Sequence, residues 1–254
     1  MHAERPFILC FCLFLNFTLF ASFAYAQPPA EHSTQQPADT ASPPVPPVTS
    51  MESYIRTRLG ADSRLYNGRE YIRNGTPAKG FPNLEWDSLM PGFLVYDGIS
   101  YHIPLEYDLA QDQLVIRNYA DNILIGLVTE KASRFSIGPY HFRYIGPGTA
   151  GIADPGFYQE LFAGSKVTLL ARKKKNLVFP TSADEQPQYF QINTYFLLLN
   201  GTGTRINNEK ELLDLLSDRK EDLKKYIRKN HLSFKRRIEG SLIQTIAYYQ
   251  QIKS

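Results

Sequence analysis

Hydrophobic and polar residues alternate along 92–112, which reads GFLVYDGISYHIPLEYDLAQD. From Ile99 to Leu109 every second residue is apolar, and the residues between them are mostly polar. Successive side chains of a strand point to opposite faces, so this pattern predicts a strand with one buried and one solvated face. Asp97-Gly98 precedes it and suits a tight two-residue turn. The stretch therefore predicts an antiparallel hairpin of 93–96 and 99–109.

Further short runs of β-branched and aromatic residues predict that the sheet continues. The predicted strands are 114–117, 123–128, 133–137, 140–145, 189–199 and 204–206. The run 157–162 fits either a strand or a helical turn. Residues 166–172 and 177–179 predict a hairpin around the basic run 172–175. Pro104 indicates that its strand is an edge or carries a bulge.

The pattern becomes helical after Asn207. Asn208 with Glu211, and Asp218 with Glu221, each resemble a capping box. Apolar spacing predicts two short helices and a last one over about 235–252 with an apolar stripe of Ile238, Leu242, Ile246 and Tyr249. The predicted fold class is α+β: an antiparallel β-meander, as a curved sheet or partly closed barrel, followed by two to three C-terminal helices.

The first 26 residues have the features of a secretory signal. Arg5 lies in a short polar region, 7–23 is apolar, and Ala24-Tyr25-Ala26 predicts cleavage before Gln27. The localisation predicted is secreted or periplasmic. An uncleaved segment anchoring the chain in the inner membrane is the alternative, because the apolar run is near the lower limit for spanning.

Residues 27–50 are rich in proline and poor in large apolar residues, so they are predicted to be a disordered linker. The predicted organisation is a signal peptide at 1–26, this linker at 27–50, a β-rich domain at 51–206, and C-terminal helices at 207–254 packed on the same domain. Met51 begins the predicted domain, and 51–59 fits a short helix.

Composition narrows the chemistry. Of 254 residues 43% are hydrophobic, enough for a core, and the net charge of +3 gives no indication of a nucleic-acid partner. Cys10 and Cys12, the two cysteines, both lie in the predicted signal. The mature chain would then have no disulfide, cysteine nucleophile or cysteine-ligated zinc. No cofactor and no metal site are predicted.

Three segments resemble a known family: YNGREY at 66–71, LEYDL at 105–109 and DRKEDLKKYIRKNHLSF at 218–234. They resemble an uncharacterised family of secreted β-rich proteins common in Bacteroidota, and the resemblance covers most of 51–254. It implies secretion and a bacterial envelope setting. It implies no activity and no site residues.

The candidate catalytic residues are Glu106, Asp108, His102 and His141. Glu106, Asp108 and His102 share the face of their strand that is predicted to be solvated, and a neighbouring strand would have to bring His141 alongside. Paired carboxylates serve acid–base chemistry only in a cleft that separates their pKa values. The alternative interpretation is that these residues solvate the outer face of the sheet.

Basic residues are concentrated between Arg219 and Arg237, where nine stand against two acidic residues. This segment is interpreted as a face for an anionic lipid, an anionic glycan or an acidic protein. The candidate binding residues are Lys224, Lys225, Arg228, Lys229, Arg236 and Arg237. The alternative is a solvated helical face with cations near helix C-termini.

Two functional hypotheses follow. The first is a non-catalytic, envelope-associated binding protein that is secreted or periplasmic. The second is a secreted hydrolase that assembles its site from scattered Asp, Glu and His residues.

Overall fold

The hairpin predicted around Asp97-Gly98 is present in the computed structural model, which describes residues 64–118, 122–182 and 184–253. β2 (Met90–Tyr96) and β3 (Ile99–Asp108) pair antiparallel with Tyr96 opposite Ile99. Asp97 and Gly98 both have positive φ, 52° and 79°. The predicted signal, the linker and the helix at 51–59 lie outside the described residues.

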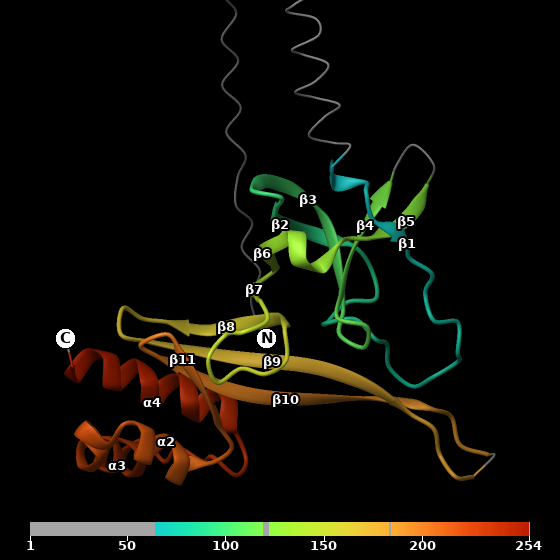
Figure 1. Cartoon of the computed structure of the whole chain (residues 1–254). Coiled ribbons are helices and arrows are strands. Elements are labelled where there is room, and N and C mark those ends of the chain that lie inside the picture. Colours follow the sequence, from blue (N-terminus) through green and yellow to red (C-terminus); the bar gives the residue numbers. More distant parts are fainter. Residues whose placement is uncertain (1–63, 119–121, 183, 254) are drawn as a thin grey trace, which may run out of the picture. The chain divides into compact units, whose positions relative to one another are not determined.

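Among the described residues, eleven strands form one antiparallel sheet in the order β1-β5-β4-β3-β2-β6-β7-β8-β9-β10-β11 (Figure 1). Pairing of β2 with β6 joins two meanders, β2–β5 and β6–β11. The prediction of an α+β fold with an antiparallel β-meander is confirmed. The sheet is open, so the alternative of a partly closed barrel is wrong. The other strands are β1 (Arg69–Glu70), β4 (Gln113–Asn118), β5 (Ile123–Gly126), β6 (Ala132–Ile137), β7 (Tyr140–Ile145), β8 (Gly156–Ala163), β9 (Val167–Val178), β10 (Gln188–Leu199) and β11 (Thr202–Ile206).

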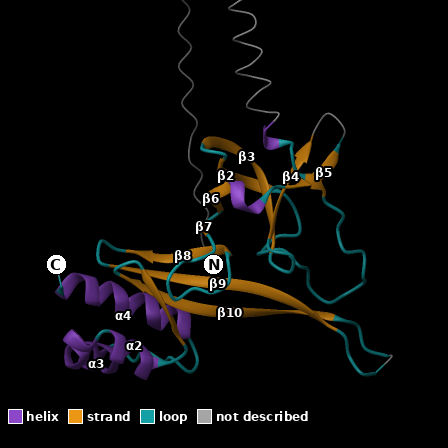
Figure 2. Cartoon of the chain, in the orientation of Figure 1, coloured by secondary structure: helices purple, strands orange, loops and turns teal. Residues whose placement is uncertain are grey.

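The α-helices α2 to α4 follow the last strand in the sequence and are drawn in purple in Figure 2. The elements in this part of the chain are α2 (Glu209–Leu215), the 3-10 turn η2 (Ser217–Arg219), α3 (Lys220–Lys229) and α4 (Ile238–Ile252), and a further 3-10 turn, η1 (Thr129–Lys131), precedes β6. Within the part of the chain that the structure describes, no helix combines the length and apolarity needed to cross a bilayer.

One predicted cap is confirmed and the other is wrong. The Asn208 side chain caps α2 by accepting the backbone N–H of Glu211 at 2.9 Å. Asp218 caps no helix, because α3 begins at Lys220 with Arg219 at its N-cap. The Asp218 carboxylate instead accepts the Tyr249 hydroxyl at 3.2 Å and pairs with Lys253 at 2.9 Å. It therefore joins η2 to the end of α4.

Three apolar clusters form the core, and the two largest are described here. In the first, the rings of Tyr107, Phe135, Phe142 and Phe157 pack with centroids 4.7 to 5.7 Å apart. In the second, α4 packs on β8 and β9, and the predicted α4 stripe is buried there at Leu242, Ile246 and Tyr249. Burial of such surface is the main favourable term in folding.

The hairpin predicted around the basic run 172–175 is wrong, because β9 continues through it to Val178. The run contains no glycine, proline or other strong turn former. Its side chains point alternately to the two faces of β9; Arg172 and Lys173 are buried, Lys175 is half-buried and Lys174 is exposed. The turn lies between Val178 and Gln188, where Pro180 and Pro187 occur.

Candidate functional site

The two candidate carboxylates of β3 are buried rather than solvated, which corrects the prediction. Glu106 is 2% and Asp108 0% exposed. The chain before β2 covers this part of β3: Leu84 N–H donates to the Tyr107 carbonyl, and Leu109 N–H donates to the Pro82 carbonyl. This covering segment has no periodic pattern, so the alternation of β3 alone could not show it.

Asp108 is saturated by hydrogen bonds. One carboxylate oxygen accepts the Tyr71 hydroxyl at 2.7 Å and the Gln111 side-chain amide at 3.0 Å. The other accepts the backbone N–H groups of Ala110 at 2.7 Å and Gln111 at 3.0 Å. Charge-assisted hydrogen bonds of this kind stabilise a buried carboxylate. Asp108 therefore fixes the β3–β4 turn and the strand that follows Gly68.

Glu106 forms a second closed network. It accepts a hydrogen bond from the Arg73 guanidinium and another from the Asn83 amide, the latter at 2.7 Å. Burial raises the pKa of the Glu106 carboxyl, and Arg73 and Asn83 oppose this rise. Its side chain has no exposed surface. A substrate therefore has no direct access to this carboxylate, although its raised pKa is typical of catalytic acids.

The two histidines are exposed and do not meet the carboxylates. The register places His102 opposite Phe93, Phe93 opposite Ser136, and Ser136 opposite His141. The histidines are thus three strands apart, about 14 Å at the usual strand spacing. Over 64–118, 122–182 and 184–253, no group of three or more His, Cys, Asp or Glu is placed to hold a metal ion.

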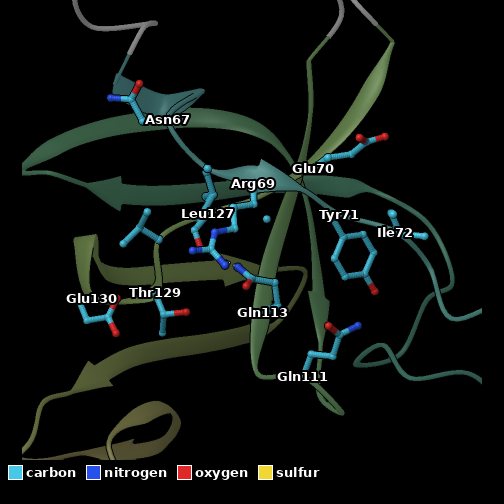
Figure 3. A pocket seen from close by; sticks show the side chains of 13 residues that line it. Asn67, Arg69, Glu70, Tyr71, Ile72, Gln111, Gln113, Leu127, Thr129 and Glu130 are labelled. Atoms are coloured by element: carbon cyan, nitrogen blue, oxygen red, sulfur yellow. Dashed lines mark hydrogen bonds between the residues drawn. The ribbon is translucent and has the colours of Figure 1, made fainter.

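A polar groove of about 520 Å³ lies beside Asp108 (Figure 3). Three parts of the chain line it: β1 with its flanking residues, the β3–β4 turn, and the segment from Gly126 into η1. Its hydrogen-bonding residues are Asn67, Arg69, Glu70, Tyr71, Gln111, Gln113, Thr129 and Glu130. The volume lies in the range of small-ligand pockets.

The walls of the groove are held by buried and partly buried hydrogen bonds. Tyr71 and Gln111 both donate to Asp108, as described above. The Gln113 amide donates to the carbonyls of Leu114 at 3.1 Å and Leu127 at 2.5 Å. A Cβ at Gly68 would lie 2.1 Å from the Gly126 carbonyl oxygen, so only glycine allows β1 to approach β5 this closely. The groove is therefore formed before any ligand arrives.

The groove offers donors and acceptors with little net charge. Arg69 is opposed by Glu70 and Glu130, and Figure 3 shows Arg69 facing Gln113 while Glu70 points away from it. Amide and hydroxyl groups both donate and accept hydrogen bonds. Ile72 and Val128 add exposed apolar surface, 77% and 36%. The lining suits a polar, nearly neutral ligand.

The basic run on β9 is mostly internal. Arg172 is 6% exposed and binds both carboxylate oxygens of Asp112, at 2.9 and 2.6 Å. Burial lowers the pKa of the Arg172 guanidinium, but the hydrogen bonds and charge of Asp112 outweigh this and raise it. Tyr107 also donates to Asp112, at 2.5 Å. This cluster joins β9 to the β3–β4 turn.

Lys173 and Lys175 also have partners inside the protein. Lys173 is 6% exposed and lies 3.7 Å from Glu239 of α4. The Lys175 ammonium donates to three carbonyls, those of Phe81 at 3.2 Å, Asn83 at 2.5 Å and Leu84 at 3.3 Å. Burial lowers the pKa of Lys175. These residues fasten β9 to other elements and leave only Lys174 exposed.

The basic face predicted at 219–237 is mostly exposed, in contrast to the basic run on β9. Lys224 pairs with Glu221 at 2.8 Å. Five further candidates are exposed and form no ion pair with any described residue: Lys225, Arg228, Lys229, Arg236 and Arg237. Lys225 with Lys229, and Lys224 with Arg228, are four residues apart on α3 and so are neighbours on its surface. Arg236 and Arg237 lie in the connection before α4.

Comparisons with protein-family models, with curated protein sequences and with solved structures found no match to this chain. The geometry of the described residues is therefore what bears on function.

Proposed function

We propose that this chain is a non-catalytic binding protein of the bacterial cell envelope, and that the polar groove beside β1 holds its ligand. The groove carries the proposal, because its lining is fixed by hydrogen bonds to the buried Asp108. Export to the envelope rests on the predicted signal and on the resemblance to secreted proteins of Bacteroidota.

The proposed ligand class is a neutral, hydroxyl-rich glycan. Sugar hydroxyls donate and accept hydrogen bonds, as do the amides and hydroxyls that line the groove. The groove is lined by two acidic residues, Glu70 and Glu130, and one basic residue, Arg69, and this balance of charge disfavours an anionic ligand. The saturated state of Glu106 and Asp108 suits a structural role better than the acid–base role that the hydrolase hypothesis requires.

Binding is tested with neutral and acidic bacterial oligosaccharides on an array, followed by calorimetry on the best neutral glycan. We expect Arg69→Ala and Glu130→Ala each to weaken binding about tenfold, the effect of one lost charge-assisted hydrogen bond. Arg134→Ala is the matched control, because Arg134 is an exposed arginine on β6 outside the groove. Equal affinities in all three variants would refute the site. Cleavage of the glycan, seen by mass spectrometry, would support a hydrolase instead.

The exposed cations of α3 favour a second candidate, adhesion to an anionic envelope surface. Clustered Lys and Arg are attracted to anionic lipid surfaces by about 1 kcal/mol each, and salt screens this attraction. The test is co-flotation with vesicles containing phosphatidylglycerol, compared with vesicles of phosphatidylcholine alone. We expect the native chain to float preferentially with the anionic vesicles in a salt-sensitive manner, and Arg228→Glu with Lys229→Glu should abolish this preference. Equal flotation of the native chain with both kinds of vesicle would exclude this candidate.

Export is tested separately. The protein isolated from an envelope fraction of its source should have a mass that begins at Gln27. A mass that includes Met1 would support the membrane-anchored alternative.

A further inference from the structure

The outer edge of β10 is open in its middle. β9 pairs with β10 along its whole length, from Gln188 to Leu199. β11 covers the other edge only from Tyr195 to Leu199, and at the opposite end Lys79 bridges to Gln188. Among the described residues, no strand pairs with the outer edge between residues 190 and 194.

The backbone groups at this opening can be identified from their neighbours. Lys79 N–H donates to the Pro187 carbonyl at 2.8 Å, and Tyr189 N–H donates to the Lys79 carbonyl at 3.1 Å. The odd-numbered residues of β10 therefore direct their N–H and C=O groups outward, because these directions alternate along a strand. Gln191 and Asn193 are the odd-numbered residues within the opening.

Pairing on the far side of the hairpin supports this assignment. Gln191 lies opposite Lys175 of β9. The Lys175 N–H points away from β10, since it donates to the Leu109 carbonyl at 3.2 Å. Gln191 must then point away from β9 as well. The N–H and C=O of Gln191 and Asn193 form no hydrogen bond with any described residue, so this edge has four free backbone groups.

The side chains do not protect this edge. Natural edge strands are usually blunted by charge, proline or a bulge. Residues 190–194 read FQINT, with no charge and no proline, and β10 pairs with β9 without a bulge. Phe190 and Ile192 are 48% and 51% exposed on one face of the strand. Apolar surface beside unpaired backbone is the feature that strand-adding partners use.

The edge is too enclosed for a second copy of this sheet. Paired antiparallel about Ile192, a second copy would place its β11 in the space occupied by β10 of the first, because β11 lies on the same edge from Tyr195 onward. A single extended segment can pair in the plane of the sheet over about three residues, about 10 Å, opposite 191–193, because Ile206 opposite Tyr195 and Lys79 opposite Gln188 close the two ends of the opening. Beyond these three residues the segment bends out of the plane of the sheet, away from β11 and Lys79.

The charge beside the opening favours an acidic side chain. A cavity of about 180 Å³ lies on the face of β10 that carries Ile192 and Thr194. Its charged residues are Lys174, Arg205, Asp154 and Arg172, and Arg172 is neutralised by Asp112. The remaining charged residues are the two cations Lys174 and Arg205 and the anion Asp154, so the net charge of the cavity lining is +1. Arg205 of β11 pairs with Phe196. It therefore lies close to the opening along the direction of β11, and its side chain is on the same face of the sheet as those of Ile192 and Thr194.

We propose that the β10 edge at residues 190–194 binds a short extended peptide segment as an added antiparallel strand, with an acidic side chain opposite Thr194 and apolar side chains opposite Ile192 and Phe190. This site is separate from the β1 groove and does not depend on the function proposed for it.

The probe is the peptide acetyl-Glu-Thr-Val-Thr-Val-amide, which matches this register. Its two Thr residues lie opposite Asn193 and Gln191 and direct their amides to β10, whereas the two Val amides point away. A peptide N-methylated at both Thr should bind at least about tenfold more weakly, and one N-methylated at both Val should bind like the parent. Fluorescence anisotropy of labelled peptides with the purified full chain measures all three.

Protein variants test the same contact from the other side. Gln191→Pro removes the outward N–H without removing a hydrogen bond to β9, so it should abolish binding, whereas Gln191→Ala should not. Arg205→Glu should reverse the preference from the Glu peptide to its Lys analogue. In amide exchange measured by NMR, the Gln191 and Asn193 amides should exchange rapidly in the free protein and slowly with peptide.

Each outcome decides the proposal. Equal binding of the two methylated peptides, protection of other amides, or no binding of the parent peptide at millimolar concentration would overturn it. If Gln191→Pro fails to fold, the methylated peptides on the native chain still decide, because they leave the protein unchanged.

Discussion

The two basic segments of this chain, 172–175 and 219–237, lie in opposite environments. The run 172–175 on β9 is mostly buried and paired inside the protein, whereas the cations of α3 and the connection before α4 are mostly exposed. A strand sends successive side chains to both faces, and both faces of β9 are covered at Arg172 and Lys173, whereas Lys174 is exposed. A helix with one buried stripe keeps its other faces in water. The element that carries a basic run, more than its charge, decides whether the run stabilises the fold or remains free for a partner.

The largest expected effect is at Arg172. Arg172→Ala leaves the Asp112 carboxylate with only the Tyr107 hydroxyl as a donor, and it removes the donor that the Phe157 carbonyl accepts at 2.6 Å. Breaking a buried ion pair costs about 3–5 kcal/mol, so the urea midpoint should fall sharply. Lys174→Ala is the matched control in the same run and should change the free energy of unfolding by less than about 0.5 kcal/mol. Similar losses in both variants would contradict the internal role of this run.

A double-mutant cycle isolates the pair itself. Arg172→Ala, Asp112→Ala and the combined variant should show an interaction free energy of about 1–3 kcal/mol in urea unfolding. Additive losses would mean that the two side chains stabilise the protein independently. Gly156 adds a steric check, since a Cβ there would lie 2.3 Å from the Arg172 guanidinium and 2.4 Å from the Asp112 carboxylate. Gly156→Ala should therefore be destabilising, both through this pair and because Gly156 has a φ of 140°, which alanine rarely adopts.

The next effect is at Lys175 and depends on pH. Lys175→Met removes the donor to three carbonyls and should cost about 1–3 kcal/mol at pH 7. Burial lowers the folded-state pKa of Lys175, so the unfolded chain binds more protons between that pKa and the ordinary lysine value. The contribution of Lys175 to stability should therefore rise with pH across this window and level off above it. The free energy of unfolding of the native chain and of Lys175→Met, measured between pH 7 and 10.5, gives this contribution. A difference between the two proteins that does not change with pH would contradict the lowered pKa of Lys175.

The smallest effect on stability is expected on α3. Arg228→Glu with Lys229→Glu places acidic groups in the last turn of the helix, where cations are favoured by about 0.3–1 kcal/mol each. The fold should therefore survive with a small loss in thermal midpoint, while any binding to anionic vesicles disappears. Lys224→Ala serves as the control on the same helix. A loss as large as that of Arg172→Ala would erase the contrast between the two runs.

Local pattern predicted most elements and few of their contacts. The β2–β3 hairpin, the strand ending at Leu199 and the Asn208 cap followed from alternation, turn residues and capping chemistry. Glu106 and Asp108 were expected in solvent because their cover is a segment without periodicity. The groove depends on β1, which is only two residues long, and on pairing between distant segments. Such tertiary contacts leave no signal within a short window of sequence.

The contacts of the basic run on β9 also predict an order of events in folding. Arg172 and Asp112 are 60 residues apart in the chain, and Lys175 and Asn83 are 92 apart. Contacts of such long range form slowly, because a large loop must close before they contribute. Each local hairpin of the two meanders can form first, and the fastening of β9 to the first meander comes late. We therefore expect Arg172→Ala to accelerate unfolding much more than it slows folding, since contacts absent from the transition state act on the unfolding rate.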